Sequence, residues 1–195
     1  MDWKKFLDFL GAMERLKCAH RHCTNSQGGP ESVADHSWRL AAMALLLAPE
    51  FPGLDMDRVI RMCLVHDLGE AVTGDIPTFL KTARDEETES RAVEELLAAL
   101  PDGSRRELEG LFREMDALET PEARLYKALD KLEGVIQHNE APISTWEPLE
   151  YDLQRDYAWM EAGWFPQTQA LREAVLRQTE EKIAGGKSHG NSKAL

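Results

Sequence analysis

Apolar residues recur at helical spacing through most of the chain, and they predict a succession of helices. Near the N-terminus, hydrophobic side chains at positions 6, 7, 9, 10, 13 and 16 fall on one side of a helix. A second helix is expected to begin near Glu31 and to contain the run Leu40–Ala48, which is hydrophobic on every side and therefore buried. Further helices are expected after Asp55, over 85–100 and 104–118, from Pro121 onward and over 165–184.

The segments between these helices are rich in turn-forming residues. Residues 18–30 include asparagine, serine, glycine and proline, so this stretch is predicted to be a loop. No stretch alternates between apolar and polar residues with period two, so no strand is expected. The pattern favours an all-α fold, with one compact helical domain over residues 1–184 and a flexible C-terminal tail over 185–195.

The composition is that of a globular protein with an acidic surface. Hydrophobic residues make up 43% of the 195 positions, and the formal net charge is −12. An acidic surface disfavours long nucleic acids as partners, although local cations or a metal can still attract a small anionic substrate. No apolar run approaches the roughly 20 residues that cross a bilayer, so no membrane partner is expected, and the first residues lack the features of a signal peptide. The three cysteines are an odd and sparse set, which predicts reduced thiols and a cytoplasmic location.

Four polar residues occupy positions where the helical pattern predicts the protein interior. They are His36, His66, Asp67 and Asp130. A buried carboxylate is costly unless it is paired, protonated or metal-bound. Two imidazoles and two carboxylates together suit one divalent ion of manganese, cobalt, nickel or iron, with magnesium also possible. Glu70 follows His66 by four residues on the same helical face, where a carboxylate could orient or deprotonate a metal-activated water.

The same residues also have purely structural interpretations. An isolated His66 would be a hydrogen-bonded core histidine, and Asp130 could pair with Lys127 or Lys131 on a solvated helix face. The joint occurrence of the four residues in apolar surroundings is what favours the metal site.

Other histidines and cysteines point to no second metal. One cluster lies in the expected loop, but its spacing matches no standard zinc site. It consists of Cys18, His20, His22 and Cys23. No histidine lies between His66 and His138, which favours a single metal and a monoester substrate, and no role is expected for His138.

Three segments contain the polar residues named above: ESVADHSWR (31–39), LVHDLGEAVTGDIPT (64–78) and KALDKLE (127–133). They resemble the HD-domain phosphohydrolases, and within them the 5′-deoxynucleotidase branch, and the resemblance covers about residues 5–180. It implies a compact helical bundle, commonly dimeric, that hydrolyses nucleoside 5′-monophosphates. It also implies one divalent metal bound by the four interior residues named above.

The resemblance assigns further roles around that metal. Glu70 matches the water-activating carboxylate, Asp75 matches a residue that completes the nucleotide pocket, and Arg21 lies where the family has a phosphate-binding arginine. The family's deoxynucleotidases have a tryptophan just after that arginine, where it contacts the sugar, but this chain has His22. The choice between deoxyribose and ribose is therefore open.

Other functions remain compatible with the sequence. Another phosphate compound, such as a nucleoside triphosphate or a phosphorylated metabolite, could be the substrate. A non-catalytic nucleotide-sensing module could use the same ligand set, and a purely helical interaction protein would bind no stoichiometric metal.

Overall fold

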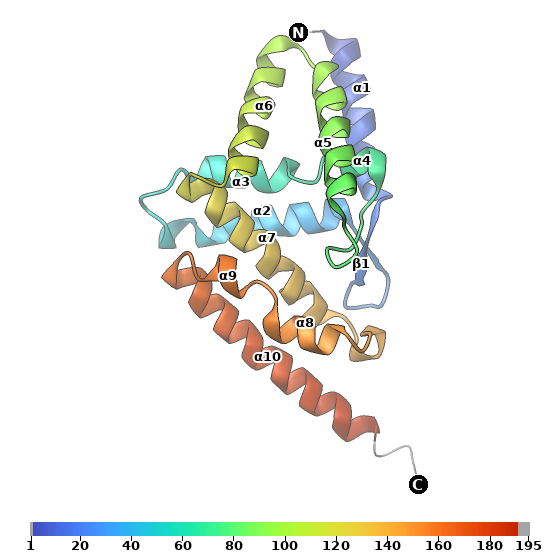
Figure 1. Cartoon of the computed structure of the whole chain (residues 1–195), viewed down its shortest axis with the longest axis vertical. Coiled ribbons are helices and arrows are strands. Elements are labelled where there is room, and N and C mark those ends of the chain that lie inside the picture. The colour runs from blue at the N-terminus through green and yellow to red at the C-terminus, as the bar shows by residue number, and fades with distance from the viewer. Residues whose placement is uncertain (1, 191–195) are drawn as a thin grey trace. The chain divides into compact units, whose positions relative to one another are not determined.

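The helices expected from the apolar pattern are present, and they group into two compact units. The computed structural model describes residues 2–190. One unit contains the residues up to His22 and Glu31–Tyr126, and the other contains Cys23–Pro30 and the residues from Lys127 onward. Each unit consists mainly of helices joined by short connections (Figure 1).

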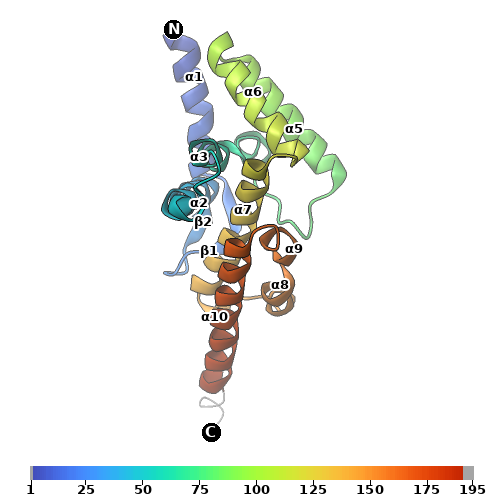
Figure 2. The ribbon, with the colours of Figure 1, turned by 90° about the vertical axis from the view of Figure 1, so that its left-hand side faces the viewer.

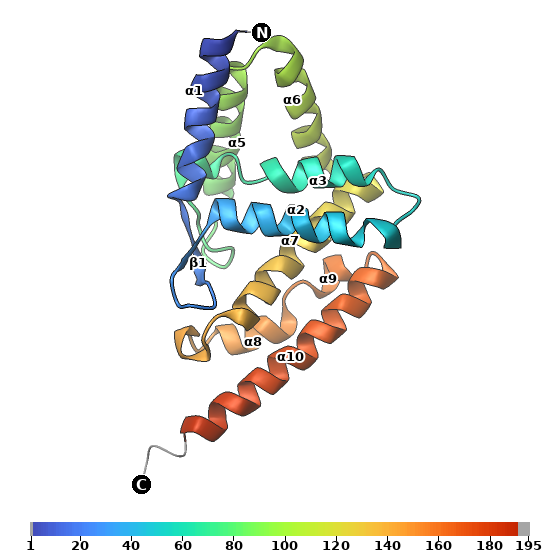
Figure 3. The same cartoon turned by 180° about the vertical axis from the view of Figure 1, so that it is seen from behind.

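The first unit is formed by the helices that precede residue 127. In chain order they are α1 (Trp3–Met13), the 3-10 helix η1 (Glu14–Lys17), α2 (Val33–Leu47), η2 (Ala48–Glu50), α3 (Met56–Val65), α4 (Glu70–Thr73), α5 (Ala83–Ala98), α6 (Asp102–Ala117) and the N-terminal turns of α7 (Pro121–Glu140). Helices α2 and α3 lie side by side, which is clearest from behind (Figure 3). Helices α5 and α6 form a second adjacent pair.

Polar side chains fix where several of these helices begin. At the start of α2, the backbone N–H of Asp35 donates to Ser32 Oγ at 3.1 Å, and the backbone N–H of Ser32 donates to Asp35 Oδ2 at 3.0 Å. This reciprocal capping box satisfies backbone donors that the helix itself leaves unpaired. Asp55 caps α3 through its carboxylate. The cap of α2 also sets the face from which His36 emerges on the first turn.

The loop expected over residues 18–30 contains a small two-stranded sheet, so the prediction of no strand is wrong here. Strand β1 (His20–Thr24) pairs with β2 (Pro30–Ser32). In the turn between them, Asn25 Oδ1 accepts hydrogen bonds from the backbone N–H groups of residues 27 and 29, both at 3.0 Å. Gly28 has a φ of +78°, a conformation that side chains disfavour. Neither strand alternates apolar and polar residues, so hydrophobic periodicity gives no sign of them.

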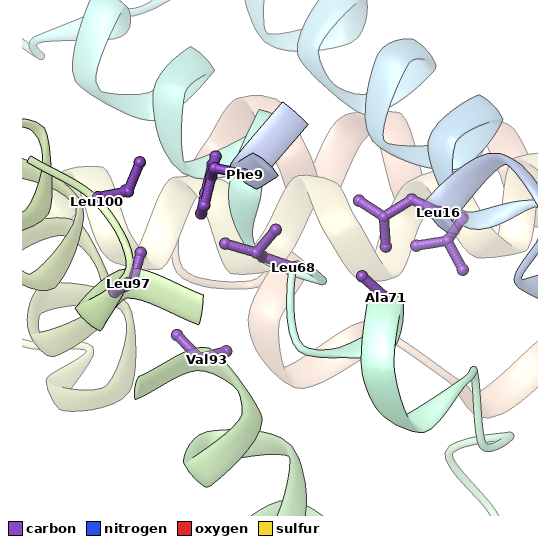
Figure 4. Close-up of a cluster of buried hydrophobic side chains, with 8 residues drawn as sticks. Phe9, Leu16, Leu68, Ala71, Val93, Leu97 and Leu100 are labelled. Atoms are coloured by element: carbon purple, nitrogen blue, oxygen red, sulfur yellow. The ribbon is translucent and has the colours of Figure 1, made fainter. Parts of the chain in front are cut away.

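The core of the first unit holds the connection between α3 and α4. Leu68 is 1% exposed and packs in one cluster with Phe9 of α1 and Leu97 of α5 (Figure 4). Ala71 of α4 lies near Leu16 of η1 in the same cluster. Burying one leucine contributes about 1.5–3 kcal/mol, so this core firmly positions the residues on either side of Leu68.

The second unit is built around the C-terminal part of α7. It also contains η3 (Ile143–Thr145), α8 (Glu150–Asp156), α9 (Trp159–Ala162) and α10 (Pro166–Gly190). Helices α8 and α9 lie along α10 (Figure 2). A buried cluster joins them to α7, and it consists of Leu132, Val135, Ala158, Ala162 and Val175.

Arg172 of α10 is fully buried in this second unit. Its Nη2 donates to the backbone oxygens of Gln154 and Arg155, at 2.7 and 2.9 Å, and its Nε donates to the backbone oxygen of Tyr157 at 2.9 Å. The guanidinium also lies 4.6 Å from the ring centroid of Trp159. These carbonyls belong to the end of α8, where a helix leaves its last acceptors unpaired, so the cation completes that helix terminus.

The all-α fold class is confirmed, with the small sheet as an addition. Helix α10 continues to Gly190, so the tail expected from residue 185 is helical as far as 190, and residues 191–195 lie outside the described residues. The structure has two compact units, and the expectation that residues 1–184 form a single domain stays a prediction. Among the described helices, none combines the length and apolarity needed to cross a bilayer.

Candidate metal centre

Three of the expected metal ligands come together in the first unit. One ligand atom each from His36, His66 and Asp67 lies within 4.8 Å of the others. His36 is fully buried near the start of α2, and the ring centroids of the two histidines are 5.3 Å apart. His66 directly follows α3, and the side chains of His66 and Asp67 are 3% and 15% exposed. The pairing of α2 with α3 thus joins residues that are thirty positions apart.

The hydrogen bonding of His66 determines which ring nitrogen faces the group. Its Nδ1 lies 3.0 Å from the backbone oxygen of Cys63. A carbonyl oxygen only accepts, so Nδ1 carries the hydrogen, and Nε2 of the neutral ring has a lone pair. Nε2 lies 3.0 Å from Asp67 Oδ2. Two acceptors at this distance repel each other unless a proton or a cation lies between them.

Arg21 of β1 lies against this group. Its Nη1 is 3.6 Å from Asp67 Oδ2, and its Nε is 3.3 Å from Oε2 of Glu31, which is 3% exposed. The side chain of Arg21 is 18% exposed. The structure therefore brings the expected phosphate-binding arginine to the metal ligands. Glu31, which orients it, is a residue that the sequence pattern did not single out.

Glu70 begins α4 and is 4% exposed. Within the described residues, its buried Oε2 has no hydrogen-bond partner, and its backbone N–H donates to the backbone oxygen of Asp67 at 3.0 Å. Burial, and then the nearby charge of Asp67, raise the pKa of Glu70 to about 9. The expected water-activating carboxylate is thus beside the ligands, in surroundings with an excess of negative charge.

Asp75 reaches this region after a turn at Gly74, which has a φ of +73° and a backbone N–H that donates to the backbone oxygen of Glu70 at 2.9 Å. Burial raises the pKa of Asp75, and the neighbouring charge of Arg21 acts in the opposite direction. Glycine suits this positive φ, because other residues are strained there. The turn therefore places Asp75 within the electrostatic reach of Arg21.

Two further charged residues belong to this region, and the sequence pattern did not single out the first of them, Glu89. Glu89 of α5 has a carboxylate oxygen within 4.8 Å of oxygens of Asp67 and Glu70, and it forms an ion pair with Lys81. Burial works against the charge of Lys81, but its hydrogen bond to Glu89 and the charges of Glu89, Glu70 and Asp67 together outweigh this effect and raise the pKa of Lys81. No periodicity marks Glu89, because α5 carries many acidic residues that are solvent-exposed.

Aromatic rings border the group. Tyr126 is 6% exposed, and its ring centroid lies 5.5 Å from that of His66. The ring of His22 makes an edge contact with Phe79 at 5.4 Å between centroids. The position of Tyr126 beside His66 was not predicted, because an aromatic residue at helical spacing is usually a core residue.

Asp130 lies on α7 in the second unit. Lys127 Nζ donates to Asp130 Oδ2 at 2.8 Å, and the Asp130 side chain is 14% exposed. The ion pair that the sequence offered as an alternative is therefore present. A lysine partner does not exclude metal binding by the second carboxylate oxygen, and the place of Asp130 in the metal set stays a prediction.

The residues of the first unit fit a divalent metal. Two imidazoles and a carboxylate provide mixed nitrogen and oxygen ligands, as first-row divalent ions prefer. The lone pair of His66 Nε2 faces a carboxylate, and the charges of Asp67, Asp75 and Glu89 add to the effect of burial in raising the pKa of Glu70. A divalent ion would remove both sources of repulsion.

The model of the HD-domain family matches residues 13–171, and the chain belongs to that family. Among curated proteins, the chain is 33% identical over 190 residues to the 5′-deoxynucleotidase HDDC2 of Bos taurus, covering 94% of this chain and 89% of that protein. It is 37% identical over 189 residues to the Xenopus laevis protein of the same name, with 93% and 90% covered.

A solved structure with the same fold is described as a predicted metal-dependent phosphohydrolase from Magnetospirillum magnetotacticum MS-1. It has a TM-score of 0.70 and 28% sequence identity to this chain, and the match covers 90% of this chain and 93% of that one.

Proposed function

We propose that this chain is a metal-dependent phosphohydrolase that releases phosphate from nucleoside 5′-monophosphates of the deoxy or ribo series. The observation that carries the proposal is the buried group of His36, His66 and Asp67, with Glu70 and Arg21 beside it. The substrate class is supported by the relatives named 5′-deoxynucleotidase, which match nearly the whole chain.

In this proposal one divalent ion is held by two histidines and two aspartates. They are His36, His66, Asp67 and Asp130. When bound, such an ion supplies positive charge for the phosphoryl group and makes water more acidic. Manganese, cobalt, nickel, iron and magnesium are all candidates.

The chain's own residues would position the substrate and move protons. Arg21 would pair with the phosphate, and its contacts with Glu31 and Asp67 hold its guanidinium at the site. Glu70 would orient the attacking water, and it would accept the water's proton once a bound cation offsets the neighbouring acids and lowers its pKa. Asp75 would contact the sugar or protonate the leaving oxygen, and its raised pKa favours the proton-bearing form that the second role requires.

The proposal is tested first by a substrate screen. Purified protein is assayed for phosphate release from ribo- and deoxyribonucleoside monophosphates, nucleoside triphosphates and sugar phosphates, with each candidate metal in turn. The expected result is phosphate release from the monophosphates. Release only from other compounds would change the substrate class, and nucleotide binding without any release would indicate a sensing module.

Glu70→Gln tests the proton-accepting role. The variant should lose about 100- to 10,000-fold in kcat, because a positioned general base contributes that much, while its metal content stays at the wild-type level. Glu87→Gln is the matched control, since Glu87 is an exposed carboxylate on α5 with its side chain 69% exposed. Full activity of Glu70→Gln would remove this residue from the mechanism.

Asp130→Asn tests the fourth ligand. The variant should bind metal about 10- to 100-fold more weakly, measured by elemental analysis after dialysis against a metal buffer. Lys127→Met removes the ion pair but leaves the carboxylate, so it should keep its metal. Equal metal contents in wild type and Asp130→Asn would show that Asp130 serves only as the partner of Lys127.

We further propose a cytoplasmic enzyme that acts as a homodimer, with a small nucleotide as substrate and no long nucleic acid or membrane as partner. The odd and sparse set of cysteines supports a reducing compartment. Sedimentation measurements over a range of protein concentrations test the dimer, and a monomer at all concentrations would contradict it.

A further inference from the structure

Three side chains of the second unit form a connected series that the proposed reaction does not use. Cys23 Sγ of β1 lies 2.9 Å from Nδ1 of His138 on α7, and His138 Nε2 lies 2.9 Å from Oε1 of Glu150 on α8. A thiol, an imidazole and a carboxylate are thus joined in that order. This is the arrangement in which a base activates a nucleophile and a third group orients the base.

The carboxylate determines how protons are distributed along the series. Glu150 is 2% exposed, and its Oε2 accepts a hydrogen bond from the backbone N–H of Glu147 at 2.5 Å. An ionised carboxylate only accepts hydrogen bonds, so Nε2 of His138 carries a hydrogen and donates a hydrogen bond to Glu150. Nδ1 of the neutral ring then accepts, and the thiol of Cys23 is the donor.

The ring of His138 is also held in place by its surroundings. Trp146 Nε1 donates to the backbone oxygen of His138 at 3.0 Å, and the two ring centroids are 5.4 Å apart. His138 is 8% exposed, whereas Cys23 is only partly buried. The base and its partner are therefore buried and fixed, whereas the thiol belongs to a residue that is only partly buried.

We propose that Cys23 is a reactive thiol, activated by His138 with Glu150 as positioning residue, and that it is the site at which small electrophiles such as hydrogen peroxide modify this protein. Transfer of the thiol proton to Nδ1 gives a thiolate beside an imidazolium, and the carboxylate of Glu150 stabilises the imidazolium. The proposal is independent of the phosphohydrolase activity.

The reaction with a peroxide balances without any other reactant. The thiolate sulfur attacks one peroxide oxygen, an S–O bond forms and the O–O bond breaks. The departing hydroxide takes the proton from the imidazolium of His138 and leaves as water. Sulfur is oxidised by two electrons to a sulfenic acid, peroxide is reduced by two electrons, and His138 returns to its neutral form.

Peptide-resolved labelling tests the proposal, because trypsin places each cysteine on a separate peptide. Cleavage after Lys17, Arg21, Arg39, Arg61 and Lys81 releases residues 18–21 with Cys18, residues 22–39 with Cys23, and residues 62–81 with Cys63. The intact protein is treated with iodoacetamide at pH 7 for increasing times, digested and quantified by mass spectrometry. Cys18 is exposed and serves as an internal reference in every sample.

Cys23 should react at least about tenfold faster than Cys18, although Cys18 is the more exposed. A thiol with the ordinary pKa of about 8.5 is about 3% thiolate at pH 7, and full ionisation raises the rate about 30-fold before the lower nucleophilicity of a stabilised thiolate is counted. Hydrogen peroxide followed by dimedone should label the same peptide first. A Cys23 rate at or below that of Cys18 would overturn the proposal.

Variants of the two partners separate activation from packing. His138→Gln should lower the rate at which iodoacetamide alkylates Cys23 to about the rate for Cys18. Glu150→Gln should lower it less and shift its pH profile upward, because Cys23 and Glu150 are the ionisable groups that contact the ring from β1 and α8. Glu147→Gln, a change at an exposed neighbour, should have no effect. If His138→Gln folds and leaves the rate unchanged, His138 does not activate the thiol; if it fails to fold, the comparison within wild type still decides.

Discussion

Residues 66–70, which include two of the expected metal ligands, approach α5 closely, and this makes Gly69 a sensitive position. A Cβ added at Gly69 would lie 2.6 Å from Cγ and 2.9 Å from the backbone oxygen of Glu89, and 3.1 Å from Cγ2 of Val93. A flexible side chain could move away, but the backbone oxygen belongs to the middle of α5 and moves only with that helix. Gly69→Ala should therefore push residues 66–70 and α5 apart.

The cost follows from overpacking of this contact. Inserting a methyl group into a well-packed site costs about 1–3 kcal/mol, and the contact with backbone places Gly69→Ala near the upper end, at about 2–3 kcal/mol. For a domain of this size, each kcal/mol lowers Tm by about 2–4 °C, so the expected decrease is about 4–12 °C. Metal affinity should fall as well, because Asp67 and Glu70 flank the displaced residue.

Thermal unfolding followed by circular dichroism measures this effect, with Gly11→Ala as the matched control. Gly11 is an exposed position inside α1, and a Cβ there meets nothing within 4 Å. Alanine is the better helix former by about 0.5–1 kcal/mol, so Gly11→Ala should raise Tm slightly. If Gly69→Ala unfolds at the wild-type temperature, the contact between residues 66–70 and α5 is not as close as the structure has it.

Two other substitutions test the polar contacts of the two units. In the first unit, burial alone would raise the pKa of Glu114, but hydrogen bonds from Arg58 and Thr120 outweigh it and lower the pKa below 4.5. The stability that the lowered pKa contributes is fully present at pH values above the pKa of Glu114 in the unfolded chain. It is lost as the pH falls through the lower pKa of Glu114 in the folded protein. Glu114→Gln should cost about 1 kcal/mol at pH 7, a figure that allows for solvent screening of the partly exposed Arg58. The difference in Tm from wild type should shrink as the pH falls through the lowered pKa of Glu114. A difference that is constant with pH would contradict the ion pair. In the second unit, Arg172→Leu should cost about 3 kcal/mol in urea unfolding, because the backbone carbonyls of Gln154 and Tyr157 lose this donor in a buried site, and the carbonyl of Arg155 keeps only Trp159 Nε1. Arg172→Lys should cost less. Equal unfolding midpoints in wild type and Arg172→Leu would show that these bonds add no stability.

Most of the helical fold was predictable because its physical causes are local in sequence. Apolar residues on one face of a helix recur every three to four positions, and start signals mark where helices begin: Asp55 caps α3 and Pro121 is the first residue of α7. The grouping of His36, His66 and Asp67 was also predictable, since polar residues at interior positions need partners.

The remaining features depend on contacts that no local pattern reveals. Strands β1 and β2 are short and polar, and they are stabilised by pairing with each other and by the turn at Asn25. Glu31 was assigned to the start of a helix, yet it pairs with Arg21. The contact between Cys23 and His138 joins positions 115 residues apart, so spacing along the chain carries no sign of it.

The burial of Leu68 between the ligands and Glu70 has a consequence for how this protein can change by mutation. Within residues 66–71, the polar residues of the proposed site stand next to small or apolar residues, of which Leu68 and Ala71 belong to the core. Inserting one residue before Leu68 would put a polar residue at the core position, and deleting one would put the leucine at the position of Asp67. Natural drift and laboratory libraries alike are therefore restricted to point substitutions here, whereas the connection between β1 and β2 offers room for length variation.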